Sequence, residues 1–230
     1  MSNNKVVSLQ IGKVSSYGNK NSKEFLDKYW ESASFKEAVI GHVWASRLGL
    51  VGDEVADKVH HGGLDKAIFA NSYENYPTWA KFLKLSHIPF GALAENLTIS
   101  TLHESNVHIG DIHQIGTALL QVSQPRKPCW KISRRWENKE FTKEIFTTGL
   151  SGWYYRVLEE GNISSGDEVK IISQNPQRVT ILNANIAFAN PNQYKEILKQ
   201  ILSIENLALS YEASILKRLQ GDTNLDYMNT

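Results

Sequence analysis

Short apolar or alternating runs, separated by turn residues, are the feature that most constrains how this chain can fold. Gly110-Asp111 and Gly166-Asp167 each stand directly before such a run, as turns do. Runs of about four to eight residues bounded by Gly, Asn and Asp are typical of all-β barrels and sandwiches. We therefore expect a mainly β fold. The predicted strands cover residues 6–11, 39–44, 55–59, 67–70, 97–100, 111–115, 118–123 and 168–172.

A few short helices are expected between these strands. Tyr73, Tyr76, Trp79 and Phe82 recur every three residues, which gives one apolar face and predicts a helix over 73–83. Two further stretches, 142–146 and 151–159, also favour helix. Gly161 would end the second of them.

The pattern changes near residue 176, after which helices replace strands. The stretches 180–189, 192–203 and 210–219 are predicted helices. Pro191 would end the first, Asn192 would cap the second, and Ser210 and Gly221 would bracket the third. We expect a β-barrel domain at 1–176, a three-helix domain at 177–221 and a flexible tail at 222–230.

Charge and cysteine usage limit the class of protein. The formal net charge is only +1. The chain therefore lacks the excess of Lys and Arg that would predict nucleic-acid binding. No run reaches the roughly 18 apolar residues that would span a membrane. The first residues lack the apolar stretch of a secretory signal, and there is a single cysteine. We expect a cytoplasmic protein that binds neither nucleic acid nor membranes.

That cysteine, Cys129, lies in the crowded segment PRKPCWK at 125–131. Positive neighbours lower the pKa of a thiol and populate the thiolate. The two prolines favour an extended backbone rather than a helix. Cys129 could be a buried structural thiol, a nucleophile paired with a nearby base, or a metal ligand.

A second dense segment is HHGGLDKA at 60–67. Gly62 and Gly63 would let backbone N–H groups approach an anion, and Lys66 is a point charge suited to phosphate. The alternative is a hairpin turn with a solvated lysine. Zinc bound by His60, His61 and Cys129 would lack a fourth ligand, and adjacent histidines in a strand point to opposite faces.

Two further positions carry polar groups suited to a ligand. Glu95 and Asn96 precede a predicted strand, where they could build a turn or offer donors and acceptors to a heterocycle edge. Arg126, next to the cysteine segment's first proline, could clamp an oxyanion or a phosphate.

Together these segments resemble the MOSC family, the domain named after the C-terminus of molybdenum cofactor sulfurase. HGGLDKAI at 61–68 resembles its HGG-x-DKAV element, and PRKPCWK resembles its PR-x-PC-x-K element. GLVGDEVAD at 49–57 and ENL at 95–97 are similar to two further elements. SGWYYRVL at 151–158 resembles a helix of the bacterial stand-alone branch, which includes the 6-N-hydroxylaminopurine reductase type and carries three C-terminal helices.

One departure from the family pattern is visible. The family has Phe-Gly before Glu-Asn, whereas this chain has Leu93-Ala94. If that position needs a positive φ, Ala94 is strained by roughly 1 kcal/mol or more.

The resemblance implies a β-barrel that binds the molybdenum cofactor, a molybdopterin, with Cys129 as the metal ligand. A thiolate is a soft metal ligand, and metal binding itself can remove the proton from the thiol. Lys66, Arg126 and Lys131 would contact the phosphate, the pterin edge or the oxo groups. A purified sample need not carry the cofactor, because the host does not always load it. The remaining residues expected at the cofactor or heterocycle are Gly62, Gly63, Glu95 and Asn96.

The implied activity is reduction of an N-hydroxylated substrate, such as a hydroxylaminopurine, to the amine. Cys129, His61, Lys66 and Arg126 would be the catalytic residues. A separate reductase would supply electrons, since no flavin or iron–sulfur motif is present. The sequence does not decide the oligomeric state, and a homodimer is one option. The alternatives are a sulfur carrier with a persulfide on Cys129, and a non-catalytic binding domain.

Overall fold

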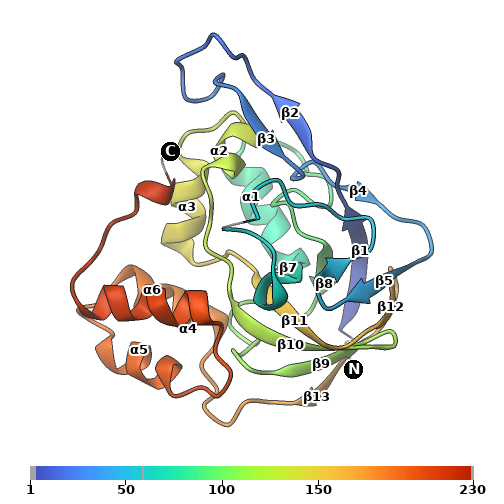
Figure 1. The fold of residues 1–230 in the computed structure, drawn as a ribbon, viewed down its shortest axis with the longest axis vertical. Helices are drawn as coiled ribbons and strands as arrows, with labels where there is room; N and C mark the ends of the chain where they lie inside the picture. The colour runs from blue at the N-terminus through green and yellow to red at the C-terminus, as the bar shows by residue number, and fades with distance from the viewer. Residues whose placement is uncertain (1–3, 59, 229–230) are drawn as a thin grey trace.

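The computed structural model describes residues 4–58 and 60–228, and its main element is a curled, mixed eight-stranded sheet (Figure 1). Neighbouring strands pair antiparallel except β7 and β8, which run parallel. The predicted mainly β architecture is confirmed. In sheet order the strands are β13 (Val169–Ser173), β9 (Ile112–Ile115), β10 (Ala118–Pro125), β11 (Trp153–Glu159), β7 (Ile68–Ser72), β8 (Leu97–Ser100), β1 (Lys5–Ile11) and β4 (Glu37–Ala38).

Two smaller sheets complete the β structure. β12 (Gly161–Ser164), β5 (His42–Ser46) and β6 (Gly49–Leu50) form a three-stranded sheet. β2 (Ser15–Tyr17) and β3 (Trp30–Ser32) form a hairpin that projects from the top of the molecule in Figure 1.

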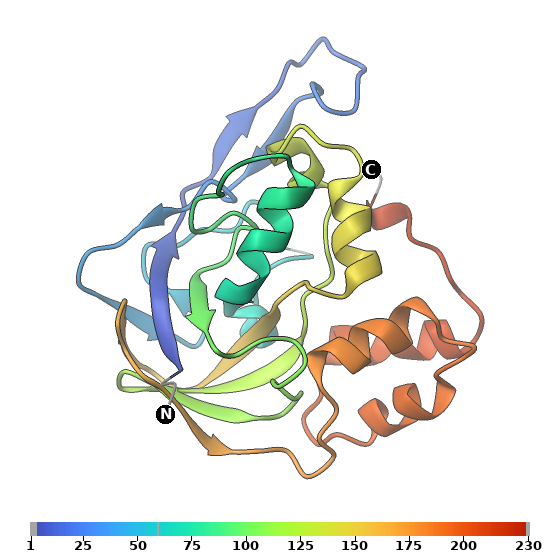
Figure 2. The ribbon, with the colours of Figure 1, turned by 180° about the vertical axis from the view of Figure 1, so that it is seen from behind.

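Three helices pack against one another beside the sheet. They are α1 (Tyr76–Phe82), which follows a 3₁₀ turn at Tyr73–Asn75, α2 (Lys131–Arg135) and α3 (Phe141–Thr148). Figure 2 shows α1 and α3 side by side. Their contact is aromatic: the Phe141 ring lies 5.5 Å from Trp79 and 5.6 Å from Phe82, between ring centroids.

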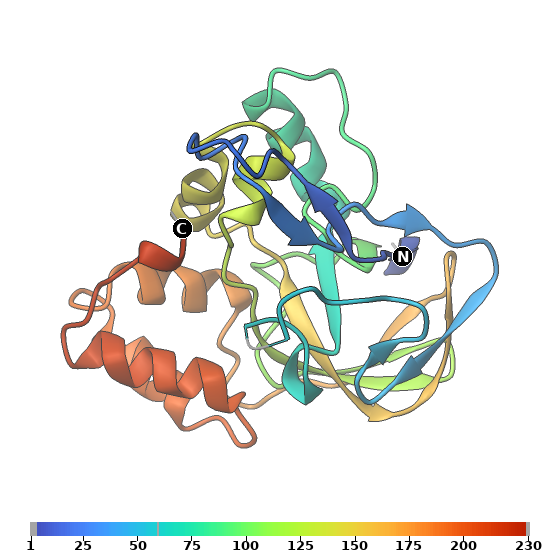
Figure 3. The ribbon, with the colours of Figure 1, turned by 45° about the horizontal axis from the view of Figure 1, so that its top comes forward.

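The C-terminal part contains α4 (Ile181–Ala189), α5 (Lys195–Leu202) and α6 (Leu209–Leu219), grouped at one side of the barrel (Figure 3). They form where the sequence pattern predicts helices. Thr180 caps α4 by accepting a hydrogen bond from the Asn183 N–H. The predicted caps Asn192 and Ser210 are wrong, because the N-cap residues of α5 and α6 are Tyr194 and Ala208.

Two predicted elements differ in the structure. Residues 151–159 do not form a helix, because 153–159 are β11 in the middle of the large sheet. Such a strand is covered on both faces, so it lacks the alternating pattern by which strands are recognised. Residues 55–58 form a loop rather than a strand, and residue 59 lies outside the described residues.

The end of the chain folds back on the molecule. Asp226–Met228 form a 3₁₀ turn, and Met228 is buried. The last two residues of the predicted tail, 229 and 230, lie outside the described part of the chain.

None of the helices in the described residues could cross a membrane. They are too short or too polar for a span of that length.

Candidate functional site

Strand β11 brings the two conspicuous sequence segments together. It pairs with β7, which follows the HHGGLDKA segment, and with β10, which leads into PRKPCWK. Ser123 on β10 donates a hydrogen bond to the Asp65 carbonyl, and Arg156 on β11 donates to the Asp65 carboxylate. The two segments, about 60 positions apart in the sequence, therefore lie close together beside β11.

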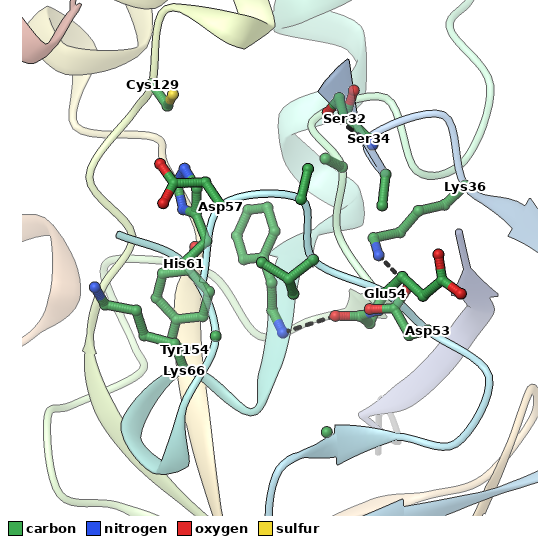
Figure 4. A pocket seen from close by; sticks show the side chains of 18 of the residues that line it. Ser32, Ser34, Lys36, Asp53, Glu54, Asp57, His61, Lys66, Cys129 and Tyr154 are labelled. Atoms are coloured by element: carbon green, nitrogen blue, oxygen red, sulfur yellow. Dashed lines mark hydrogen bonds and ion pairs between the residues drawn. The ribbon is translucent and has the colours of Figure 1, made fainter. Parts of the chain in front are cut away.

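A cavity of about 150 Å³ lies between these segments and residues 32–36, which comprise the end of β3 and the loop after it. Figure 4 shows Cys129 at one side of it, near Asp57 and His61, and Lys36 with Asp53 at the other. Seven of the nine predicted site residues line the cavity: His61, Gly62, Lys66, Asn96, Arg126, Cys129 and Lys131.

A second cavity of about 390 Å³ adjoins the first. It extends from the motif loops to α6, whose Ser210 lines it. Cys129 is thus reached from both cavities. The residues common to both are Asp57, His61, Lys66, Cys129 and Tyr154.

The thiol of Cys129 is half-buried immediately before α2. Burial raises its pKa above the ordinary value, and Arg126 and Lys131 only partly oppose that effect. The expectation that flanking cations make Cys129 a thiolate is therefore wrong for the ligand-free protein. A metal ion that binds this sulfur must displace its proton.

Arg126 is the most informative side chain of the site. Only 5% of it is exposed, and its guanidinium lies 5.3 Å from the centre of the Phe69 ring. Its Nη1 atom is buried with no hydrogen-bond partner among the described residues. A buried cationic donor left unpaired is costly, so its presence on a cavity wall indicates an anionic ligand.

His61 and Lys66 are both affected by burial. Burial and the neighbouring Arg126 lower the pKa of His61 to about 4, so its imidazole is neutral at pH 7. Burial also lowers the pKa of Lys66, whose amine donates to the His60 carbonyl over 2.8 Å. In Figure 4 this amine lies on the opposite side of the cavity from Lys36.

The far side of the cavity contains residues that the sequence did not single out. Lys36 forms an ion pair with Asp53, and both side chains are largely buried. The hydroxyl of Ser34 is buried without a hydrogen-bond partner among the described residues. Asp53 could have been found from its place in the GLVGDEVAD segment, whereas no sequence signal marks Ser34 or Lys36.

The predicted role of Glu95 is not supported. It is fully buried and does not line either cavity. Its carboxylate accepts hydrogen bonds from the Gly91 and Leu93 N–H groups and from the Tyr76 hydroxyl. Glu95 therefore holds the 91–95 loop in place, which is a structural task.

Asn96 lines the cavity, but its amide is engaged elsewhere. Its oxygen accepts from the Phe69 N–H, and its nitrogen donates to the Gln10 carbonyl and to Asp53. Gly63 lies outside both cavities and begins a 3₁₀ turn with a φ of 84°. Neither residue presents a side-chain group to a heterocycle.

Within the part of the chain that the structure describes, no group of three or more His, Cys, Asp or Glu side chains could hold a metal ion. His60 instead bonds to Asp57, with 2.9 Å between Nδ1 and Oδ2. The zinc alternative with His60, His61 and Cys129 has no support among these residues.

Comparisons with known proteins show what the chain is similar to. The MOSC domain model matches residues 57–170. YflK, an uncharacterized protein of Bacillus subtilis (strain 168), is 36% identical over 215 residues, which cover 93% of each chain. The protein YiiM of Escherichia coli (strain K12) is 36% identical over 192 residues, or 81% of this chain and 84% of YiiM.

A protein of Gibberella moniliformis (strain M3125 / FGSC 7600) named reductase is 35% identical over 159 residues. That match covers 66% of this chain and 28% of the longer fungal protein. Among solved structures, YiiM from Geobacillus stearothermophilus superposes with a TM-score of 0.77 at 30% identity. The superposition covers 94% of this chain and 99% of that one.

Proposed function

The chain belongs to the MOSC domain family, and on that premise we propose that it is a molybdenum-cofactor-dependent reductase of N-hydroxylated compounds. The observation that carries the proposal is the unpaired, buried Nη1 of Arg126 on the wall of the cavity that also holds Cys129. The relative named reductase supports the class of reaction.

The residues of the cavity fit the molybdenum cofactor. Cys129 offers a soft sulfur ligand for molybdenum. Arg126 offers an unused cationic donor, and Lys66 and Lys131 add positive charge for phosphate or oxo groups. At the far side, the unpartnered hydroxyl of Ser34 lies in the same wall as Lys36. We assign these residues to the cofactor.

The cofactor, when bound, supplies the two-electron oxygen-atom chemistry. Reduction of a hydroxylamine breaks the N–O bond, takes up two electrons and two protons, and releases water. The neutral imidazole of His61 lines the cavity beside the sulfur, where it can donate or accept a hydrogen bond at the substrate oxygen. Arg126 and Lys66 stabilise negative charge that develops on the substrate oxygen, and their burial strengthens that effect.

The two electrons must come from a second protein in this scheme. The sequence has no flavin or iron–sulfur motif, so we expect a separate reductase as the physiological donor. An artificial donor can replace it in an assay.

The experiment is a hydroxylamine reduction assay with an artificial electron donor on cofactor-loaded protein. We expect the wild type to convert 6-N-hydroxylaminopurine to adenine, and Cys129→Ala to show no reduction above the uncatalysed rate. Lys199→Gln, at an exposed ion pair with Glu196 on α5, should match the wild type. Equal rates in the wild type and Cys129→Ala would refute the assignment of Cys129 to the reaction.

A sulfur carrier is the second candidate. Two features favour it: Cys129 is reached from two cavities, and Arg126 and Lys131 are close enough to stabilise a persulfide anion. Mass spectrometry separates the candidates. A stable gain of one sulfur on Cys129, in protein that does not reduce hydroxylamines, would favour the carrier.

A further inference from the structure

The larger of the two cavities is lined in part by residues that are not assigned to the cofactor. Its volume of about 390 Å³ lies within the roughly 300–1,000 Å³ typical of small-molecule sites. Beyond the residues shared with the smaller cavity, it is lined by an indole, an amine, a proline ring and three further polar side chains. These are His60, Gln124, Lys127, Pro128, Trp130 and Ser210.

Lys127 gives this cavity a positive charge. Its amine donates to the Ser214 hydroxyl on α6 over 3.0 Å, which holds it between the barrel and the helix. The neighbouring charges that act on Lys127 most strongly are Lys66, Lys217 and Arg218, and all are positive. A bound anion would offset this mutual repulsion, and a lysine amine is a point charge suited to phosphate.

Trp130 supplies a fixed aromatic surface at the same cavity. The Arg134 guanidinium lies 4.2 Å from the centre of its ring, and the Trp30 and Phe25 rings contact it edge-on at 6.1 and 6.5 Å. The indole is therefore held in place before any ligand arrives. Planar heterocycles stack on such surfaces, and every nucleobase has a face suited to this contact.

We propose that the 390 Å³ cavity is the substrate subsite and that it selects a nucleotide, with the phosphate at Lys127 and the base at Trp130. This inference rests on the proposed function, and it names N-hydroxylated nucleoside monophosphates as the preferred substrate class, bound more tightly than the free base. Cys129 and His61 line both cavities, so the reacting group of such a substrate can reach the residues assigned to the cofactor side.

Binding can be measured without turnover. Adenosine monophosphate is the amine product of the expected reaction, adenosine is its uncharged counterpart, and inorganic phosphate tests the anion alone. Calorimetric titration at low salt should show at least a tenfold higher affinity for adenosine monophosphate than for adenosine. Lys127→Gln, which keeps a donor for Ser214, should reduce the affinity for the nucleotide about tenfold or more. Lys199→Gln is the matched control and should bind like the wild type.

Equal affinities for the nucleotide and the nucleoside, or unchanged nucleotide binding in Lys127→Gln, would overturn the proposal. Molybdenum content separates substrate from cofactor. If Lys127→Gln keeps the wild-type molybdenum content, the subsite serves the substrate. If it loses molybdenum, Lys127 holds the cofactor's own phosphate and the inference is wrong. Selective nucleotide binding in a wild type that never takes up molybdenum would support the subsite and refute the proposed function.

Discussion

Ala94 shows how one residue can store strain beside a cavity. Its φ is 73°, in the region that glycine adopts without cost, and it stands where the family pattern has glycine. Residue 94 therefore has the positive φ under which strain at an alanine is expected. We expect Ala94→Gly to raise the free energy of unfolding by roughly 0.5 to 1 kcal/mol, because relief of strain outweighs the added chain entropy.

Urea denaturation of the wild type and Ala94→Gly measures this difference. Ala92→Gly, two residues away and fully buried at an ordinary φ, is the control and should be destabilised. A loss of stability in Ala94→Gly as large as in Ala92→Gly would show that the backbone at residue 94 is unstrained.

His113 is a buried titratable residue away from the candidate site. Its Nδ1 atom lies 2.7 Å from the Tyr155 hydroxyl, and burial lowers its pKa from 6.5 to about 4. The unfolded chain therefore binds more protons than the folded protein between these two values. Stability must fall as the pH drops through this window, by about 2 kcal/mol between pH 7 and pH 5 for this residue alone.

His113→Gln removes the titration and keeps a group that can bond to Tyr155. We expect the free energy of unfolding to depend less on pH in this variant, by about the same 2 kcal/mol over pH 7 to pH 5. Comparison with the wild type cancels the contribution of the other acidic and basic groups. Parallel pH profiles for the two proteins would argue against a neutral, buried His113.

At the scale of elements, helix α4 provides a clear test of capping. The Thr180 hydroxyl accepts a hydrogen bond from the Asn183 N–H at 3.0 Å. Thr180→Ala should lower the free energy of unfolding by about 1 kcal/mol. Asn192, a residue that the sequence pattern also favours as a cap, is exposed and does not occupy the N-cap position of α5.

Asn192→Ala should therefore change stability by less than about 0.5 kcal/mol. Thermal or urea denaturation of both variants, side by side, checks the pair. The structural account of these caps would be contradicted if Asn192→Ala cost as much as Thr180→Ala.

Most strands and helices could be predicted from the sequence because their patterns are local. β8 has the bounds expected from its apolar run, and α4 begins after the Thr180 cap. β11 could not be recognised, because Trp153–Tyr155 are buried on both faces of the strand and such a continuous apolar run also suits a helix. Identifying it requires knowing its neighbours, β7 and β10, which are distant in the sequence.

The same distinction holds for the candidate site. The motif residues Cys129, Arg126 and His61 were predicted, because their spacing and chemistry are visible in single segments. Ser34 and Lys36 were not predicted, since only the folding of the 33–36 loop against the barrel brings them to the cavity. The protonated state of Cys129 was also missed, because sequence shows the neighbouring charges but not the burial.

At the scale of the whole molecule, one hydrophobic core joins the sheet to the C-terminal helices. Ile181 at the start of α4 is fully buried in the same cluster as Val107, Ile109 and the strand residues. We propose that the barrel and the three helices unfold together. Ile181→Ala should cost about 2 to 5 kcal/mol, whereas Leu209→Ala, at an exposed position of α6, should cost little.

Two spectroscopic signals test this cooperativity. All six tryptophans lie before residue 176, so their fluorescence reports on the barrel, while far-UV circular dichroism follows all the helices, including α4, α5 and α6. Both signals should change at the same urea concentration, and Ile181→Ala should shift both midpoints equally. Loss of helical signal while the fluorescence remains native would show two units that unfold separately.

In the proposed function, the sulfur of Cys129 holds molybdenum in a cavity whose cations bind the rest of the cofactor. The most direct test is the molybdenum content of protein made in a host that synthesises the cofactor. We expect molybdenum well above background in the wild type and in Lys199→Gln, and a loss to background in Cys129→Ala. A wild type without molybdenum, or an undiminished content in Cys129→Ala, would contradict the proposed function.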